Sequence, residues 1–204
     1  KYAYVWDALK NNFDEYRKYI VEITAYTLPR FGQVKPVYYT IAENLIKYAE
    51  QMKLKEDERS EEYKSKNIAK TLEEIFPEGI DNELQLKLVR AQLNFVSGIL
   101  GEDNPLVKKI WNGKTGDEAA ELVLKNSMLT SKEKVDELLN KSPDEILNSA
   151  DPFIYFLQNT QNKRKEMLEK AAELNASIEV LNQLLGEAGF KIYGDKIPPD
   201  ATLT

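Results

Sequence analysis

The sequence predicts an all-α protein, and three observations support that fold class. The 204 residues include only 9 glycines and 8 prolines, so residues that interrupt regular structure are few. Apolar residues recur at steps of three and four, which is typical of one helix face, rather than alternating as in a strand. Capping residues and prolines flank these periodic runs. Because 42% of the residues are hydrophobic, we expect a helical bundle with a sizeable core.

The first two helices are predicted from periodicity alone. A 3-4-3-4-3 spacing places one apolar stripe on a first helix, which must end by Pro29 because proline lacks the amide that a helix needs. The stripe consists of Trp6, Leu9, Phe13, Tyr16, Ile20 and Ile23. A second helix is expected over residues 37–54.

The next two helices are predicted from their boundaries. The charged stretch 55–59 indicates a solvated turn, and a third helix is expected to follow it and to stop at Pro77. Its apolar positions are Tyr63, Ile68, Leu72, Ile75 and Phe76. Asp81 is the predicted N-cap of a fourth helix, and Gly101 lies just past its end. The predicted stripe of this fourth helix is Leu84, Leu88, Ala91 and Phe95.

Four short helices are predicted between Leu106 and Leu147. Each is preceded by a capping oxygen or a first-turn proline, at Asn104-Pro105, at 115–118, at 130–133 and at Ser142-Pro143. Asp151-Pro152 then opens the longest element, in which apolar positions continue in steps of four and three to Ile192. This stripe is Phe153, Leu157, Thr160, Arg164, Met167, Ala171, Leu174, Ile178, Leu181, Leu185, Ala188 and Ile192. At ~1.5 Å per residue the helix would be about 60 Å long.

We expect the first and last helices to pair side by side, because both carry a repeat of about 3.5 residues. If they run antiparallel, Lys1 and Gly194 lie near each other, and the body resembles an insertion into another domain. The run Ile197 to Thr204 reads as a turn followed by the opening of a strand. We therefore expect a helical domain over 1–196 and, over 197–204, the stub of a strand that returns to another domain. The alternative is that the long stripe forms an intermolecular coiled coil in a homodimer.

Composition excludes several kinds of function. The chain contains no histidine and no cysteine, so it holds no Ser-His-Asp or Cys-His machinery and no ordinary zinc site. A net charge of −6 argues against a nucleic-acid partner. Charged residues interrupt every candidate span, so no segment approaches the ~20 apolar residues that cross a bilayer. We expect no catalytic residue, no metal site and no cofactor within this chain.

Several motifs suggest chemistry but have simpler explanations. Gly113-Lys114-Thr115 resembles the end of a phosphate-binding loop, but Lys108 stands where that loop requires glycine. Asn175-Ala176-Ser177 matches the N-glycosylation pattern, but it lies within a predicted helix. The acidic pairs are expected on solvated faces and first turns, where they complement the helix dipole; they are Glu61-Glu62, Glu73-Glu74, Glu102-Asp103 and Asp117-Glu118. Ser131-Lys132 is no dyad, because adjacent side chains on a helix point apart.

Tyrosine is concentrated in the first third of the chain. Nine of the eleven tyrosines fall between Tyr2 and Tyr63. Because Tyr38 and Tyr39 are adjacent, we expect that both cannot face one core and that some hydroxyls line a groove or a domain interface. Arg164 falls on the long stripe itself, which indicates a place where that stripe meets solvent or another domain, or a snorkelling side chain.

Several segments together carry a family resemblance. They are 104–110, 113–115, 118–123, the turn 56–63 with its Arg59, 150–154, and the run from Tyr193-Gly194 to 197–204. These segments resemble the helical domain of bacterial serine dipeptidyl peptidases of the type 7 and type 11 family. The last is the most specific, since a similar Pro-Asp-Ala-Thr segment there begins the return into a chymotrypsin-like double β-barrel.

The resemblance implies a division of labour. Such enzymes keep the triad His and Asp ahead of the helical insert and the nucleophilic Ser after it, so this chain would be inactive alone. The insert covers the active-site cleft and restricts access to peptide N-termini. An Asn-containing segment that grips the N-terminus in relatives has no match here. The implied partners are the β-barrel catalytic domain of the same parent chain and a peptide substrate, in the periplasm or at the cell surface. The rival interpretation is a free-standing helical adapter that binds another protein through its heptad stripe or its tyrosines.

Overall fold

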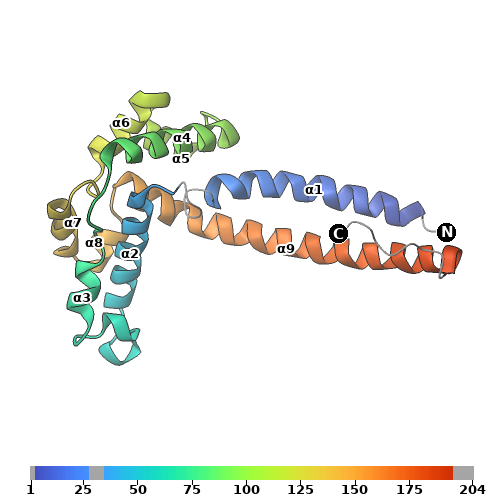
Figure 1. The fold of residues 1–204 in the computed structure, drawn as a ribbon, viewed down its shortest axis with the longest axis horizontal. Helices are drawn as coiled ribbons and strands as arrows, with labels where there is room; N and C mark the ends of the chain where they lie inside the picture. The colour runs from blue at the N-terminus through green and yellow to red at the C-terminus, as the bar shows by residue number, and fades with distance from the viewer. Residues whose placement is uncertain (1–2, 28–34, 195–204) are drawn as a thin grey trace. The chain divides into compact units, whose positions relative to one another are not determined.

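The structure, a computed structural model, describes residues 3–27 and 35–194, and within these ranges every regular element is a helix (Figure 1). The all-α prediction is therefore confirmed. The chain divides into two compact units, one made of residues 1–23 and 165–204 and the other of residues 24–164. The predicted strand at 197–204 lies outside the described residues, as does Lys1.

The first unit is a helical hairpin. It is formed by most of α1 (Ala3–Thr27) and by the second part of α9 (Pro152–Tyr193), which lie side by side (Figure 1). Val5 and Leu9 near the start of α1 pack against Ile178 near the end of α9. The two helices therefore run antiparallel, which confirms the predicted pairing.

The register of α9 matches the prediction, but that of α1 does not. In the hairpin the α9 stripe is buried or half-buried from Met167 to Ala188, whereas Ile192 is exposed. On α1 the exposed side chains include Trp6 (64% exposed), Phe13 and Ile20, so half of the predicted stripe is wrong. The observed seam repeats in steps of four and three at Val5, Leu9, Asn12, Tyr16, Tyr19 and Ile23.

The buried line of α1 is difficult to recognise in the sequence because one of its positions is a polar residue. Asn12 Nδ2 donates a hydrogen bond of 2.7 Å to Ser177 Oγ of α9, so an amide occupies a seam position where an apolar residue is expected. The neighbouring line of Trp6, Phe13 and Ile20 also repeats every seven residues, and periodicity cannot tell which of two adjacent lines is buried.

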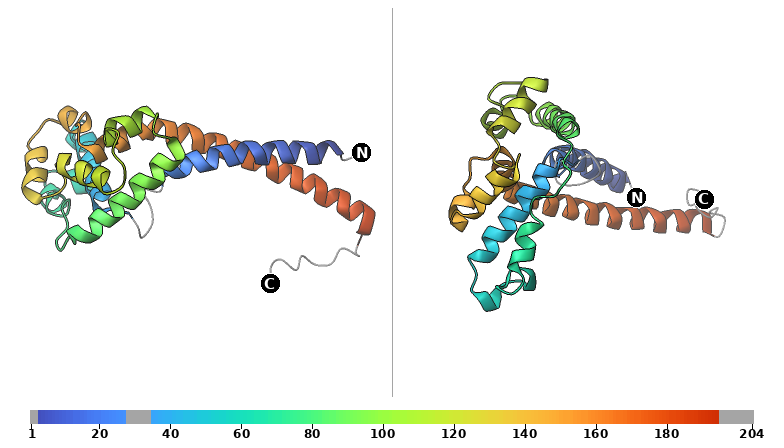
Figure 2. Two further views of the ribbon diagram at one scale, coloured as in Figure 1. Left: turned by 90° about the horizontal axis from the view of Figure 1, so that it is seen from above. Right: turned by 60° about the vertical axis from the view of Figure 1, so that its left-hand side comes forward.

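The second unit is a cluster of short helices around α2 and the first turns of α9. α2 packs against α8, and α4 packs against α5 and α6, which also contact each other. Figure 2 shows these helices from two further directions and shows α9 as one uninterrupted helix. The remaining helices are α2 (Val37–Met52), α3 (Ile68–Glu73), α4 (Asn82–Leu100), α5 (Pro105–Trp111), α6 (Gly116–Asn126), α7 (Lys132–Leu139) and α8 (Pro143–Leu147).

The four short helices begin where predicted, and the predicted capping side chains are engaged at three of them but not at Thr115, which precedes α6 without a capping hydrogen bond. Asn104 accepts a hydrogen bond from Leu106 N (2.9 Å) at the start of α5, and Ser131 accepts one from Lys134 N in α7. Ser142 and Glu145 form a reciprocal capping box at α8. These side chains satisfy amides that a short helix would otherwise leave unpaired.

Tyr38 and Tyr39 are both buried, at 2% and 4% exposure, which overturns the expectation that only one could face the core. The Tyr38 ring lies 5.3 Å from that of Phe153, and Tyr39 meets Phe153 and Phe156 edge-on at 5.0 and 5.7 Å. α2 is surrounded on more than one side, so adjacent residues can face the same core from different directions. Burial also raises the pKa of Tyr38.

The predicted stripe of α4 is wrong by one position. Its buried side chains are Gln85, Val89, Gln92, Leu93 and Val96, whereas Leu84 and Phe95 are exposed. Gln85 is buried because its Oε1 accepts a hydrogen bond of 2.8 Å from Val37 N, an amide at the start of α2 that has no partner within its own helix. A glutamine thus takes a core position that periodicity assigns to a leucine.

The third predicted helix is divided in two. Tyr63 closes a short 3-10 turn, Glu61–Tyr63, and α3 begins only at Ile68. Asn67 Nδ2 donates to Glu61 O at 2.8 Å, and Thr71 Oγ1 donates to Glu62 O at 2.7 Å, so polar side chains satisfy carbonyls that a continuous helix would have paired. Among the residues that the structure describes, no helix has the length and apolarity that crossing a membrane requires.

Candidate functional site

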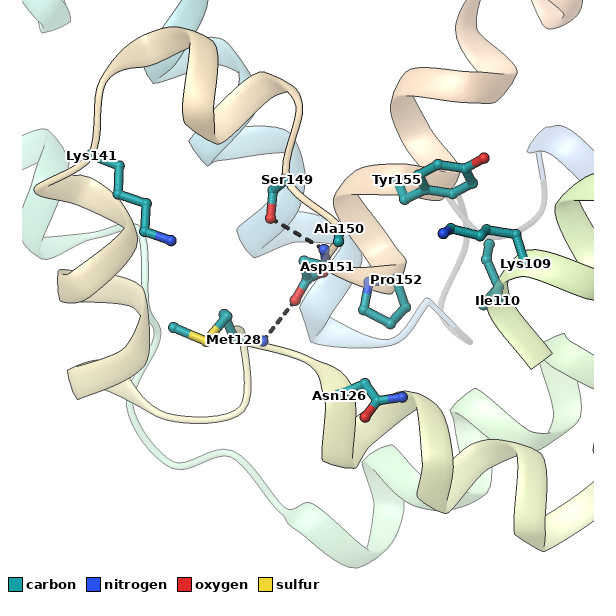
Figure 3. A pocket seen from close by; sticks show the side chains of 10 residues that line it. All are labelled: Lys109, Ile110, Asn126, Met128, Lys141, Ser149, Ala150, Asp151, Pro152 and Tyr155. Carbon is teal, nitrogen blue, oxygen red and sulfur yellow. Dashed lines mark hydrogen bonds between the residues drawn. The ribbon is translucent and has the colours of Figure 1, made fainter. Parts of the chain in front are cut away.

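A pocket of about 480 Å³ lies in the second unit, where the last turn of α5, the connection between α6 and α7, and the start of α9 come together (Figure 3). Its volume is in the range of small-ligand sites. The lining residues are Lys109, Ile110, Asn126, Met128, Lys141, Ser149, Ala150, Asp151, Pro152 and Tyr155.

The base of the pocket is organised by the buried carboxylate of Asp151, which is 3% exposed. One oxygen accepts hydrogen bonds from Ser127 Oγ and Met128 N, both at 2.7 Å. The other accepts from the first-turn amides of α9, Phe153 N at 2.9 Å and Ile154 N at 3.3 Å. Asp151 is therefore the N-cap of α9 and also fixes the connection between α6 and α7.

The electrostatic role of Asp151 is internal to the fold. Burial raises its pKa, and the four donors partly offset that effect. Because both oxygens and the α9 amides are already engaged with each other, neither the carboxylate nor this helix terminus is free to bind a ligand. Any charge recognition in the pocket must come from other side chains.

Two lysines supply that charge. Lys109 belongs to the last turn of α5, and Lys141 lies between α7 and α8. Figure 3 shows their side chains on opposite sides of the Ala150–Pro152 segment. Neither ammonium forms an ion pair within residues 3–27 and 35–194. Hydrogen bonds from Ser142 lower the pKa of Glu145, and Lys141 does interact electrostatically with this carboxyl, which contributes to the same shift.

The remaining wall is largely apolar and is shared with a second pocket. Ile110, Met128 and Pro152 contribute hydrocarbon surface, and Tyr155 contributes its ring. Tyr155 also lines a pocket of about 280 Å³ together with Tyr26, Asn104, Pro105, Leu106, Asn159, Thr160 and Lys163. Tyr26 and Tyr155 agree with the expectation that some tyrosines line a groove, although Tyr155 lies outside the tyrosine-rich first third.

A larger hollow of about 810 Å³ between the α3–α4 connection and the start of α7 has a different character. Three glutamates, Glu73, Glu78 and Glu133, line it together with Lys132, whose ammonium lies 3.6 Å from Asp136. Because this lining is mainly acidic and that of the Asp151 pocket includes two lysines and an apolar wall, we consider the Asp151 pocket the better candidate for a binding site.

The motifs that suggested chemistry have structural roles. Lys114 forms an ion pair with Glu118 at 2.9 Å, and Gly113 lies in a turn with φ of 74°, so the 113–115 segment connects two helices and does not follow a strand. Ser131 is the N-cap of α7, as described above. Asn175-Ala176-Ser177 lies inside α9, as predicted.

The acidic pairs do not converge. Glu62 pairs with Lys47 at 2.7 Å, Glu61 pairs with Lys64, and Asp117 pairs with Arg90 at 2.6 Å. Within the described part of the chain no cluster of acidic residues is arranged to hold a metal ion. Arg164 is half-buried, and its Nε is buried without a hydrogen-bond partner, so it lies on the stripe as predicted without a resolved role.

Sequence reasoning missed Lys109 and Lys141. Lys109 lies in one of the segments that carry the family resemblance, but nothing in its spacing distinguishes it from Lys108. Lys141 lies in a loop far from Lys109 in the sequence, and only the fold brings the two together. No local signal could have found this pair.

The described residues form an all-α fold with a pocket beside Asp151 that two lysines help to line. A family model described as Peptidase S46 matches residues 1–204, so the chain belongs to the peptidase S46 family. No curated protein and no solved structure matches the chain.

Proposed function

We propose that the chain is the non-catalytic helical cap domain, residues 1–196, of a bacterial serine dipeptidyl peptidase of the type 7 and type 11 family. The observation that carries this proposal is the peptidase family match over residues 1–204, in a chain that has no histidine to complete a catalytic triad. In this proposal the domain covers the active-site cleft of a β-barrel catalytic domain and restricts access to peptide N-termini.

An exposed apolar line on α4 supports a further domain as partner. Leu84 and Phe95 are exposed and Leu88 is half-buried, at the spacing that predicts a buried stripe. Sequence patterns that the fold leaves unused are typical of functional surfaces. We assign this line to contact with the catalytic domain of the parent enzyme.

The central test is an activity assay. The purified 204-residue chain is incubated with fluorogenic dipeptidyl substrates, and no hydrolysis above buffer is expected. Hydrolysis that rises in proportion to the concentration of a homogeneous preparation would overturn the non-catalytic role. A second test is cell fractionation of the source organism with an antibody against the chain, which we expect to detect it in the periplasm or at the cell surface.

A second candidate function is a free-standing helical adapter, and the exposed aromatic residues of the hairpin favour it. Trp6 and Phe13 on α1 and Phe190 on α9 are all exposed. Sedimentation analysis separates the two candidates: a stable homodimer lost on Trp6→Ser and Phe13→Ser substitution supports the adapter, whereas a monomer supports the cap domain.

A further inference from the structure

The connection between α5 and α6 begins with Asn112-Gly113, the single Asn-Gly pair in the sequence. Asn112 is the C-cap of α5 in the left-handed conformation, with φ of 49° and ψ of 41°. Gly113 follows with φ of 74°. Both residues are exposed, so water and hydroxide reach the carboxamide of the first and the backbone amide of the second.

The amide nitrogen of Gly113 is not engaged in the turn that surrounds it. Asn112 N donates to Lys108 O and Lys114 N donates to Trp111 O, both at 3.0 Å. Within the residues that the structure describes, neither Gly113 N nor the Asn112 side chain has a hydrogen-bond partner. A Cβ placed on Gly113 would meet no atom within 4 Å, so the space beside this nitrogen is open. An unhindered amide nitrogen therefore follows an exposed carboxamide.

We propose that Asn112-Gly113 is a site of spontaneous deamidation. Hydroxide removes the proton of Gly113 N, and this nitrogen attacks Cγ of Asn112 after rotation about the Asn112 Cα–C bond. A new C–N bond forms, the carboxamide C–N bond breaks, and ammonia leaves. Water then opens the resulting succinimide at either carbonyl, which gives aspartate or isoaspartate at position 112. The net reaction consumes water and releases ammonia, and nothing is oxidised or reduced.

Another asparagine in the second unit shows what protects such a residue. Asn148 is also exposed and precedes a serine, but its Nδ2 donates to Asp144 O at 2.8 Å. The next amide, Ser149 N, donates to Ile146 O at 3.1 Å. Both bonds must break before attack, which should make Asn148 react about tenfold more slowly than Asn112, in addition to the steric effect of the serine side chain.

The modification acts on the end of α5. Isoaspartate places an additional CH2 group in the main chain, and either product adds a negative charge at the C-terminus of a helix, where the helix dipole disfavours it. Asn112 N closes the last turn by donating to Lys108 O. That turn carries Ile110, which lines the Asp151 pocket, and Trp111, which is 2% exposed. Deamidation should therefore loosen this turn and expose Trp111.

The test is a timed incubation of the 204-residue chain at neutral and at mildly alkaline pH, followed by digestion and mass spectrometry. Deamidation is detected as the mass gain from replacing NH2 with OH, and isoaspartate by labelling with an isoaspartyl methyltransferase. The Asn112 peptide should gain mass at least about tenfold faster than the Asn148 peptide. The gain should be faster at the higher pH, because the attacking nitrogen must lose its proton.

The same incubation in urea separates the effect of the fold from that of the sequence. Unfolding removes the hydrogen bonds that protect Asn148, so the ratio of the two rates should fall by about tenfold. A ratio that rises in urea would show that the fold protects Asn112, and it would overturn the proposal. Equal rates at the two sites in the folded chain would also overturn it.

Variants test the consequence for α5 in a Trp6→Phe background, in which fluorescence reports on Trp111. The emission of the incubated chain should shift to longer wavelength over time. Asn112→Gln, which closes an imide ring much more slowly, should abolish both the mass gain and the shift, whereas the matched control Asn148→Gln should leave both unchanged. A mass gain at Asn112 without a change in emission would overturn the effect on α5.

Discussion

Removing the Asp151 carboxylate should destabilise the second unit more than any surface substitution. In Asp151→Ala the N-cap of α9 is lost, at about 1 kcal/mol, and the donors Ser127 Oγ and Met128 N lose their acceptor, at about 1–3 kcal/mol for each group left unsatisfied. We expect a total loss of about 3–7 kcal/mol, a large part of the ~5–15 kcal/mol typical of a domain. Asp151→Asn keeps one acceptor oxygen and should lose about 1–3 kcal/mol.

The assay is urea unfolding followed by fluorescence in a Trp6→Phe background. The chain has two tryptophans, and Trp111 is buried in the second unit, so the remaining signal reports on that unit. Asp144→Ala is the control, because Asp144 pairs with Lys53 at 2.7 Å on the surface and should change stability by less than about 1 kcal/mol. If Asp151→Ala unfolds at the same urea concentration as this control, the reasoning about the buried network is wrong.

The Asp151 carboxyl group should also make the stability of the fold depend on pH in a defined direction. Burial raises the pKa of Asp151 above its ordinary value of 3.8, so the folded state holds the proton more tightly than the unfolded state. Through this group alone, stability increases as the pH falls through the folded pKa. The Asp151→Asn variant lacks this contribution, and the difference in unfolding free energy between variant and wild type should therefore grow as the pH is lowered through that range.

Three further predictions test the packing and the electrostatics. Leu9→Ala should cost about 2–4 kcal/mol in urea unfolding followed by circular dichroism, whereas Trp6→Ala should cost less than about 0.5 kcal/mol; the reverse order would restore the register expected from the sequence. Gln85→Ala should cost about 1–3 kcal/mol by the same measurement, because Val37 N loses its acceptor, and an unchanged midpoint would show that water replaces it. The pKa of Glu56 is lowered, chiefly by a hydrogen bond from the backbone amide of Ser65. The contribution of Glu56 to stability is therefore present above its ordinary pKa of 4.5 and is lost as the pH falls through the pKa of the folded state. Glu56→Gln should therefore flatten acid unfolding below about pH 4.5, and an unchanged acid profile would contradict the assignment.

Long-range periodicity and helix capping were the parts of the fold that could be predicted. The α9 stripe extends over many turns, so a chance match is improbable, and the prolines and capping side chains that open the short helices act through local hydrogen bonds. Both kinds of signal depend on residues that are close together in the sequence. They led to the fold class, the antiparallel hairpin and the short-helix boundaries.

The buried faces of α1 and α4 could not be predicted, because tertiary hydrogen bonds decide them. Asn12 and Gln85 occupy buried or half-buried positions only because Ser177 Oγ and Val37 N are opposite them. The Asp151 pocket escaped prediction for the same reason. Lys109 and Lys141 line the same pocket only because of how α6 and α7, which separate them in the sequence, are folded.

Tyr155 lines two pockets of the second unit. The 480 Å³ hollow beside Asp151 and the 280 Å³ hollow beside Tyr26 share this residue in their linings. A substitution at Tyr155 therefore changes the lining of both hollows at once.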